Sequence, residues 1–347
     1  MLLLLYFVYD FHGLLMLPSK HLTALMEESM NRLGLPMPVP GSSSVMSRGV
    51  TIWEVGARDG LQNEQTAVST DTKLEFLSRL ATAGLRVIEA TSFVHPKRVP
   101  QLADADALMA RLHRHPGVDY PVLVANERGL DRALAADARN IAIFASATDS
   151  FAQRNLGRSL DEQYTMFEPV VRRARAEGLQ VRGYLSMCFG DPWEGRVAID
   201  KVTTVGRRLL ELGCCQLSLG DTIGVATPSH VAAVVEHFRS AGVDVGALAV
   251  HFHDTYGQAL ANTLAALEHG VSVVDSSAGG LGGCPFAGTA TGNLATEDLV
   301  WMLNGLGIDH GVDLAALCAT SLWLADRLQR PSPSRVVTAF AEQCRLA

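Results

Sequence analysis

The chain has 347 residues, of which 48% are hydrophobic and 19% are charged. This size and composition suit one large globular domain or two medium ones. The net charge of -7 disfavours binding to nucleic acid and to anionic membranes, so we expect neither as a partner.

Residues 1–46 differ in character from everything that follows. The stretch "MLLLLYFVYDFHGLLML" is apolar but interrupted by Asp10 and His12, and it lacks both a basic start and a small-residue cleavage site. It therefore matches a secretory signal poorly, and it is short for a membrane-spanning helix. We expect residues 1–46 to be disordered or extraneous to the fold, either as an upstream extension from a start codon assigned too early or as a poorly matched targeting segment.

From residue 50 onward, short runs of β-forming residues alternate with longer helical patterns. The eight predicted strands cover 50–55, 86–90, 120–125, 140–145, 180–186, 215–219, 248–253 and 272–277. The clearest helical patterns cover 70–83, 99–114, 159–177, 195–212, 228–240 and 256–269. Glycines follow four of these helices in the position that ends a helix, namely Gly84, Gly178, Gly213 and Gly270.

Eight strand–helix units have the size of a TIM (β/α)8 barrel, an α/β fold, which we predict for residues 47–306. Residues 307–347 add two further helical patterns, separated by "RPSPS", as a C-terminal cap. A doubly wound open sheet is the alternative, but it usually carries a nucleotide-binding loop after its first strand. The segment "GARDGLQNE" at that place has neither the GxGxxG nor the Walker A pattern.

Polar side chains follow nearly every predicted strand, at the end where barrel enzymes assemble their active sites. These residues are Glu54, Arg58, Asp59, Glu89, Ser92, Arg182, Tyr184, Asp221, His251, His253 and Asp254. A barrel that served only as a scaffold would have little reason to place ionisable groups there. The sequence therefore predicts an active site at this end of the barrel.

The segment "HFHD" indicates a metal site, because the alternation of a strand places His251 and His253 on the same face. Two unrelated core histidines are the simpler interpretation of such a pair. Two imidazoles with a carboxylate from another strand end, however, suit a divalent ion with open coordination positions. We predict Asp59, His251 and His253 as ligands, with Asn293 as the fourth at the end of the glycine-rich segment "GLGGCPFAGTATGN".

Four further residues have two interpretations each. Asp254 either joins the site or, as we favour, caps the next helix. Glu54 is either the structural partner of a basic side chain or a catalytic group. Arg58 either pairs with its neighbour Asp59 or stabilises an enolate. Cys284 is either an inert thiol or, as part of a glycine-rich lid, a proton donor or acceptor.

The six cysteines form neither a CxxC pair nor a regular pattern. This usage is typical of a reducing compartment rather than of a disulfide framework, and we expect a cytoplasmic protein.

The strings "EVGARDGLQNE", "IEATSFVHPKRVPQLAD", "SLGDTIGVATP", "HFHDTYGQALAN" and "GLGGCPFAGTATGNLATEDLVWML" together resemble the 3-hydroxy-3-methylglutaryl-CoA lyase family. The resemblance runs from Thr51 to the C-terminal helices. It implies a TIM-type barrel, Mg²⁺ or Mn²⁺ as the cofactor, a homodimer, and an acyl-CoA substrate. The implied reaction is the cleavage of (S)-3-hydroxy-3-methylglutaryl-CoA into acetyl-CoA and acetoacetate.

The resemblance also implies roles for individual residues. The metal ligands fall on Asp59, His251, His253 and Asn293. Catalytic roles fall on Arg58, Cys284, Asp221, His251 and Glu89, substrate contacts on Arg58, Gln62, Ser92, Arg182 and Tyr184, and a supporting role on Glu297.

Departures from the family pattern leave alternatives open. The segment "SFAQRNLGRSL" lacks the more common "KNINCS", so a lyase for a longer 3-hydroxy-3-alkylglutaryl-CoA is one alternative. A Claisen-type acyl-CoA condensing synthase shares the Arg–Asp and HxH elements, but the string "GLGGCP" favours the lyase. A catalytically silent barrel that acts as a scaffold is the third alternative.

Overall fold

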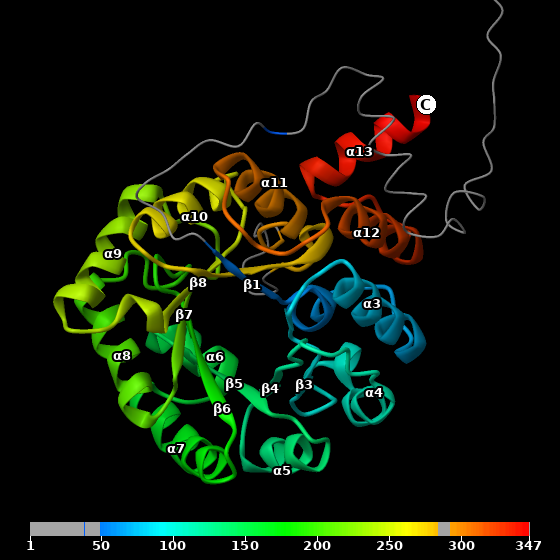
Figure 1. The fold of residues 1–347 in the computed structure, drawn as a ribbon. Coiled ribbons are helices and arrows are strands. Elements are labelled where there is room, and N and C mark those ends of the chain that lie inside the picture. The colour runs from blue at the N-terminus through cyan, green and yellow to red at the C-terminus, as the bar shows by residue number, and fades with distance from the viewer. Residues whose placement is uncertain (1–37, 39–48, 284–291, 347) are drawn as a thin grey trace, which may run out of the picture.

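The computed structural model describes residues 38, 49–283 and 292–346. Figure 1 shows the strands arranged around a central axis with helices outside them, as the predicted barrel requires. The strands are β1 (Thr51–Glu54), β2 (Val87–Ile88), β3 (Thr91–Phe93), β4 (Val122–Val124), β5 (Asn140–Ser146), β6 (Gln180–Ser186), β7 (Gln216–Asp221), β8 (Leu248–Phe252) and β9 (Val273–Ser276).

The helices follow the strands in alternation. The longer ones are α3 (Thr70–Thr82), α4 (Ala105–Arg111), α5 (Glu127–Ala135), α6 (Asp149–Leu156), α7 (Leu160–Ala176), α8 (Ile199–Leu212), α9 (Pro228–Ser240), α10 (Ala259–Glu268), α11 (Thr296–Leu306), α12 (Leu314–Leu328) and α13 (Arg335–Leu346). Four short helical turns complete the set, η1 (Gly56–Gly60), η2 (Pro100–Leu102), η3 (Val245–Ala247) and η4 (Ala278–Gly280).

All strand pairs are parallel, in the order β2-β1-β9-β8-β7-β6-β5-β4-β3. The predicted strand 86–90 is wrong in extent, because only Val87–Ile88 of it forms β2, and β3 follows at Thr91–Phe93. Backbone hydrogen bonds from the residues between β2 and β3 join both neighbouring strands and so close the barrel. The N–H of Glu89 donates to Glu54 in β1, while the N–H of Ala90 donates to Pro121 ahead of β4.

Most predicted helices are confirmed, and the larger errors lie at their starts, although the helix predicted at 99–114 also ends early, at Arg111. The pattern at 99–114 begins instead with η2, and α4 follows only at Ala105. The predicted helices 195–212 and 256–269 begin three or more residues late, at Ile199 and Ala259. The glycine ends are confirmed, since Gly178 and Gly213 adopt φ values of 80° and 122°, where a side chain would be strained.

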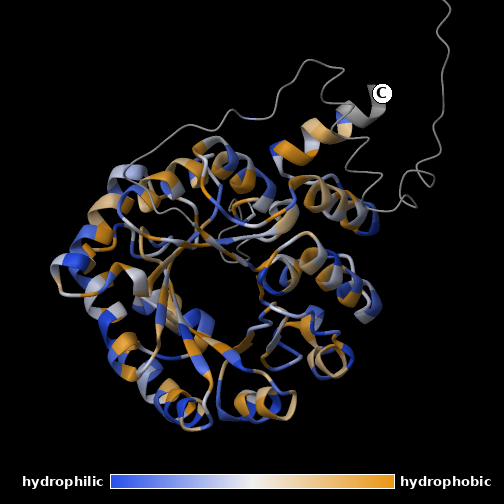
Figure 2. Cartoon of the chain, viewed as in Figure 1, coloured by the Kyte–Doolittle hydropathy of each residue, from blue (hydrophilic) through white to orange (hydrophobic). Residues whose placement is uncertain are grey.

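The main hydrophobic core lies between the sheet and the outer helices. Large apolar side chains from both layers are fully buried there, among them Phe76, Phe167, Phe238 and Phe252. Figure 2 shows hydrophobic and hydrophilic residues on the same outer helices, as expected for helices with one face against the sheet. Helices α12 and α13, predicted as a cap, lie beside α3 and α11 (Figure 1).

The barrel interior divides into an apolar and a polar side. Leu123, Ala142 and Tyr184 form a separate hydrophobic cluster on strands β4 to β6, with Phe144 against it. Charged side chains occupy much of the remaining interior, and they make up the site described next. Across the described part of the chain, no helix combines the length and apolarity needed to cross a membrane.

Candidate functional site

The turn η1 after the first strand carries two of the predicted site residues. The N–H groups of Arg58 and Asp59 both donate to the carbonyl oxygen of Val55, at 3.1 and 2.7 Å, in a π-helical turn. A Cβ atom at Gly60 would lie 2.8 Å from Ser277 Oγ, so glycine lets the turn pack closely against the chain after β9. Such widened turns recur at functional sites because they redirect side chains.

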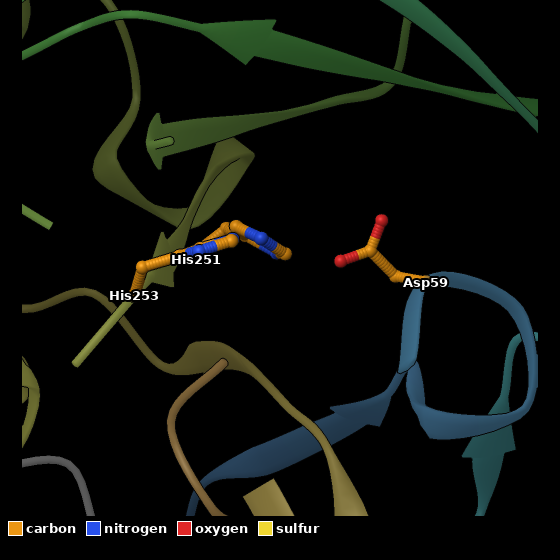
Figure 3. A group of neighbouring side chains, drawn as sticks. All are labelled: Asp59, His251 and His253. Atoms are coloured by element: carbon orange, nitrogen blue, oxygen red, sulfur yellow. The ribbon is translucent and has the colours of Figure 1, made fainter. Parts of the chain in front are cut away.

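The three predicted ligands Asp59, His251 and His253 come together. One ligand atom from each lies within 4.8 Å of the others, and Figure 3 shows the two imidazoles and the carboxylate facing one another from β8 and η1. The side chains of Asp59 and His251 are 18% and 12% exposed, so the cluster is open on one side. The strand alternation that predicted a shared face for both histidines is confirmed.

Asn293, the fourth predicted ligand, borders this cluster. Its Nδ2 atom donates to Asp59 Oδ2 and to the Leu281 carbonyl oxygen, both at 3.0 Å. Its Oδ1 atom is buried and has no hydrogen-bond partner within the described residues. An amide that is held through nitrogen and presents an unused oxygen beside two imidazoles and a carboxylate fits a metal ligand. The donor atoms of Asp59, His251, His253 and Asn293 therefore fit a divalent cation.

The electrostatic surroundings keep Asp59 ionised. Burial alone would raise its pKa, but Arg58, His251 and His253 outweigh burial and lower the pKa to about 2. A carboxylate that is charged at every physiological pH is the form that binds a cation.

Asp275 on β9 orients His251 by a hydrogen bond to Nδ1, and the sequence analysis did not predict this role. Its Oδ2 atom accepts from His251 Nδ1 at 3.2 Å and from Ser218 Oγ at 2.8 Å, while Oδ1 pairs with Arg182 Nη2 at 2.5 Å. Burial raises its pKa, but Arg182, His251 and Ser218 lower it overall. A carboxylate on one ring nitrogen fixes the imidazole and leaves Nε2 free to bind a cation.

Glu89 is the anchor of a second network, which contains Arg58. Its carboxylate accepts from Arg58 Nε at 2.8 Å, from Tyr184 Oη at 2.5 Å and from Trp53 Nε1 at 3.3 Å. Arg58 also bonds to Asp59 through Nη1. This network connects the arginine to the metal cluster.

The charges in this network shift two pKa values. Burial disfavours the guanidinium, yet Glu89 and Asp59 together raise the pKa of Arg58 above its ordinary value. Burial, followed by the charge of Glu89, raises the pKa of Tyr184 well above the ordinary value for a phenol. Arg58 therefore stays positively charged and Tyr184 stays a neutral donor throughout the physiological range.

Asp221 ends β7 beside the metal cluster. Its two oxygens accept the N–H groups of Val225 and Ala226, both at 2.9 Å, which ties the following turn to the strand. Burial raises its pKa to about 6, while these bonds and His251 act against the rise. The position of Asp221 near His251 is compatible with its predicted role in support of catalysis.

The predicted substrate contacts line the interior and its rim. Ser92 Oγ and the Nε and Nη1 atoms of Arg182 are buried without a hydrogen-bond partner in the part of the chain that the structure describes. Gln62 follows η1 and is half-buried. Buried polar atoms without partners are uncommon, and these atoms are available to a ligand or to water.

Glu54 supports backbone rather than a basic side chain. Its fully buried carboxylate accepts from the N–H groups of Gly56 and Ala278, both at 2.8 Å, and from Thr296 Oγ1 at 2.6 Å. Burial raises its pKa to about 7. Of the two interpretations of Glu54, pairing with a basic side chain is not what the structure shows, because two amides and a hydroxyl satisfy this carboxylate.

Glu297 supports η4 in the same way. Its carboxylate accepts the N–H of Gly279 at 2.9 and 3.0 Å and the hydroxyl of Ser321. Burial raises its pKa to about 8. Glu297 thus acts on the backbone that leads toward Leu281, the carbonyl partner of Asn293.

Two of the predicted residues remain, Asp254 and Cys284. Asp254 Oδ1 accepts the N–H of Ala259 at 2.9 Å at the start of α10, so the predicted helix cap is confirmed. Cys284, predicted as catalytic, lies outside the described residues.

Known proteins resemble this chain over most of its length. The HMGL-like family model matches residues 49–323. The cytoplasmic 3-hydroxy-3-methylglutaryl-CoA lyase of Rattus norvegicus is 49% identical over 84% of this chain and 84% of its own. The mitochondrial hydroxymethylglutaryl-CoA lyase of the same organism is 49% identical over 86% of this chain and 91% of its own. The HMG-CoA lyase of Acinetobacter baumannii, solved with coenzyme A and 3-methylmalate, has a TM-score of 0.81 and 36% identity, covering 86% of this chain and 97% of that one.

Proposed function

Because the chain belongs to the HMGL-like family, we propose that it is a hydroxymethylglutaryl-CoA lyase that uses a divalent cation to cleave (S)-3-hydroxy-3-methylglutaryl-CoA into acetyl-CoA and acetoacetate. The observation that carries this proposal is the cluster of Asp59, His251 and His253 next to the unused Oδ1 of Asn293. These four side chains would hold the cation. A mixed nitrogen and oxygen set without thiolate favours Mg²⁺ or Mn²⁺ over a structural zinc ion.

When bound, such a cation lowers the pKa of a hydroxyl group that coordinates it and orients the substrate. The proton of the tertiary hydroxyl also needs an acceptor beside the site. We assign it to Asp59 or His251: a carboxylate that binds a cation keeps further lone pairs, whereas His251, whose Nδ1 is held by Asp275, would accept the proton at Nε2 only while Nε2 does not hold the cation. Of the two, Asp59, with a pKa of about 2, is the weaker base. Asp221 assists through its charge, which acts on His251.

Loss of that proton drives the cleavage. The bond between the carbinol carbon and the CH₂ group next to the thioester breaks, and its electron pair passes to the thioester as an enolate. The carbinol carbon becomes the ketone of acetoacetate. Arg58 stabilises the developing enolate charge, because Glu89 fixes its guanidinium and its raised pKa keeps it charged.

The enolate becomes acetyl-CoA when its carbon takes up a proton. We assign this step to Cys284, as the family resemblance implies. Substrate contacts fall to Gln62, Ser92, Arg182 and Tyr184, of which Ser92 and Arg182 have buried donors available.

The lyase reading is favoured over its alternatives. The relatives at 49% identity carry lyase names, which speaks against a condensing synthase. The alternative of a longer substrate is tested by comparing the turnover of a longer 3-hydroxy-3-alkylglutaryl-CoA with that of 3-hydroxy-3-methylglutaryl-CoA in the same assay.

An acyl-CoA substrate agrees with the relative solved with coenzyme A. We propose a homodimer, as the resemblance implies. The named relatives include cytoplasmic and mitochondrial forms, and of these we propose the cytoplasm, where thiols outside disulfides, such as those of Cys188, Cys214 and Cys215, would stay reduced.

The test is a coupled assay for acetoacetate with 3-hydroxy-3-methylglutaryl-CoA. We expect turnover that EDTA abolishes and that added Mg²⁺ or Mn²⁺ restores. Asp59→Asn should lose this activity, whereas the matched control Asp254→Asn, which alters only the cap of α10, should keep it. Turnover that persists in EDTA would contradict the proposal.

A further inference from the structure

Trp53 is a large side chain in the barrel interior to which the reaction described above assigns no part. It is the third residue of β1 and is half-buried. Trp53 lies opposite Asp275 on β9, which lies opposite His251 on β8. Residues paired in this way point to the same face of a sheet. The indole therefore lies in the same layer of the interior as His251.

The indole contacts two charged groups of the site at once. Its Nε1 atom donates to Glu89 Oε2 at 3.3 Å. Its ring lies against the guanidinium of Arg182, with 4.0 Å between the guanidinium carbon and the ring centre. One side chain thus connects the carboxylate that holds Arg58 with the arginine that pairs with Asp275.

The N–H of Trp53 matters to the orientation of Glu89. The Glu89 carboxylate also accepts hydrogen bonds from Nε and Nη2 of Arg58 and from the hydroxyl of Tyr184. Donors therefore surround this fully buried carboxylate. Loss of one donor leaves a buried oxygen with fewer partners and lets the carboxylate rotate. Because Arg58 is bonded to both oxygens of Glu89, its guanidinium would shift with it.

The ring face of Trp53 matters to Arg182. Within the described part of the chain this guanidinium makes one ion pair, from Nη2 to Asp275, which by itself permits rotation about that contact. The flat rings of Trp53 and Tyr184, at 4.0 and 5.0 Å, restrict the rotation. They keep Nε and Nη1, which have no partner among the described residues, in one direction.

We propose that Trp53 is a positioning residue of the lyase reaction, acting through Glu89 on the orientation of Arg58 and through its ring on Arg182. This inference rests on the proposed function. The indole acts through two properties, its N–H donor and its flat ring face. Different substitutions remove one or both of them.

Two substitutions test these properties in the Mg²⁺-loaded enzyme. Trp53→Phe keeps a flat ring but removes the donor, so kcat should fall about tenfold while KM stays within about twofold. Trp53→Val removes both, so kcat should fall about a hundredfold and KM should rise as well. Trp323→Phe is the matched control, because Trp323 also stacks on arginines, Arg79 and Arg327, but does so on helix α12. It should keep wild-type kinetics.

A double-mutant cycle shows whether Trp53 acts through Glu89. In a Glu89→Gln background, Trp53→Phe should lower kcat by less than about twofold, because the group it positions is already altered. Thermal unfolding of each variant checks that the losses are not a loss of folded protein.

The outcomes separate this inference from the proposed function. A wild-type enzyme that forms no acetoacetate overturns both. An active wild type overturns the inference alone if Trp53→Phe keeps full kcat, if its effect multiplies with that of Glu89→Gln, or if activity falls only in proportion to the folded fraction.

Discussion

Asn293 donates its side-chain N–H to Asp59, with 3.0 Å between Nδ2 and Oδ2, although 234 residues separate the two in the chain. This bond turns the amide so that Oδ1 is left without a partner among the described residues. The turn η1 and the segment before α11, which meet here, would thereby provide a carboxylate and an amide oxygen for the same cation.

The first prediction concerns this amide. Asn293→Ala should lower the affinity for Mn²⁺ by about 10- to 100-fold, because it removes a ligand oxygen and the donor that orients Asp59. Isothermal titration of the metal into the substrate-free protein measures the change. Asn155→Ala on the outer helix α6 is the control and should bind Mn²⁺ as the wild type does.

A second prediction concerns the carboxylate behind His251. Asp275→Asn removes the charge that pairs with the fully buried Arg182 and should lower the free energy of unfolding by about 3–5 kcal/mol. Urea unfolding at neutral pH measures this loss. Asp244→Asn, at the exposed start of η3, should cost far less. Equal losses in the two variants would contradict the proposed importance of the buried pair.

The third prediction concerns the arginine of η1. Arg58→Lys keeps a positive charge but cannot bond to Glu89 and Asp59 with the same geometry. We expect kcat to fall about 10²- to 10³-fold, as is typical for loss of one group that stabilises an oxyanion. The KM should change little, and Arg111→Lys, a surface ion pair with Asp71, should be neutral. A large rise in KM at constant kcat would instead assign Arg58 to ground-state binding.

The fourth prediction concerns the pH dependence of stability. The pKa of Glu297 is about 8 in the folded protein against an ordinary value of 4.5. The folded state therefore binds this proton more tightly than the unfolded state does. Its stabilising contribution is complete below pH 4.5 and is lost as the pH rises through about 8.

Urea unfolding at a series of pH values checks the sign. The free energy of unfolding of the wild type should fall between pH 6 and 8.5, where Glu297 contributes at most about 1.4 kcal/mol per pH unit and Glu54, with a pKa of about 7, adds to the fall up to that pH. Glu297→Gln should flatten this slope, whereas Glu75→Gln on the surface of α3 should not. A slope that is unchanged in Glu297→Gln would assign the pH dependence to other groups.

Local patterns predicted much of the site. His251 and His253 share a face because the alternation of a strand is a property of every extended chain, and it needs no knowledge of neighbouring strands. The barrel likewise follows from repeated strand and helix patterns. The caps and glycine helix ends are local as well, which explains why Asp254 and Gly213 behave as predicted.

Residues whose role depends on how the strands pair could not be predicted from the sequence. Asp275 lies in "SVVDSS", which reads as an apolar strand with a polar end, and only its pairing with His251 reveals its contact. Trp53 looks like an ordinary strand residue until Glu89 and Arg182 are brought against it. The role of Glu54 stayed open between a basic partner and catalysis, because the sequence does not reveal that three donors from its surroundings satisfy the carboxylate.

The most direct test of the account is the anomalous diffraction of a crystal soaked in Mn²⁺. The account predicts a single strong peak within bonding distance of Asp59, His251, His253 and the Oδ1 atom of Asn293. A peak elsewhere, or one that contacts only two of these side chains, would contradict it.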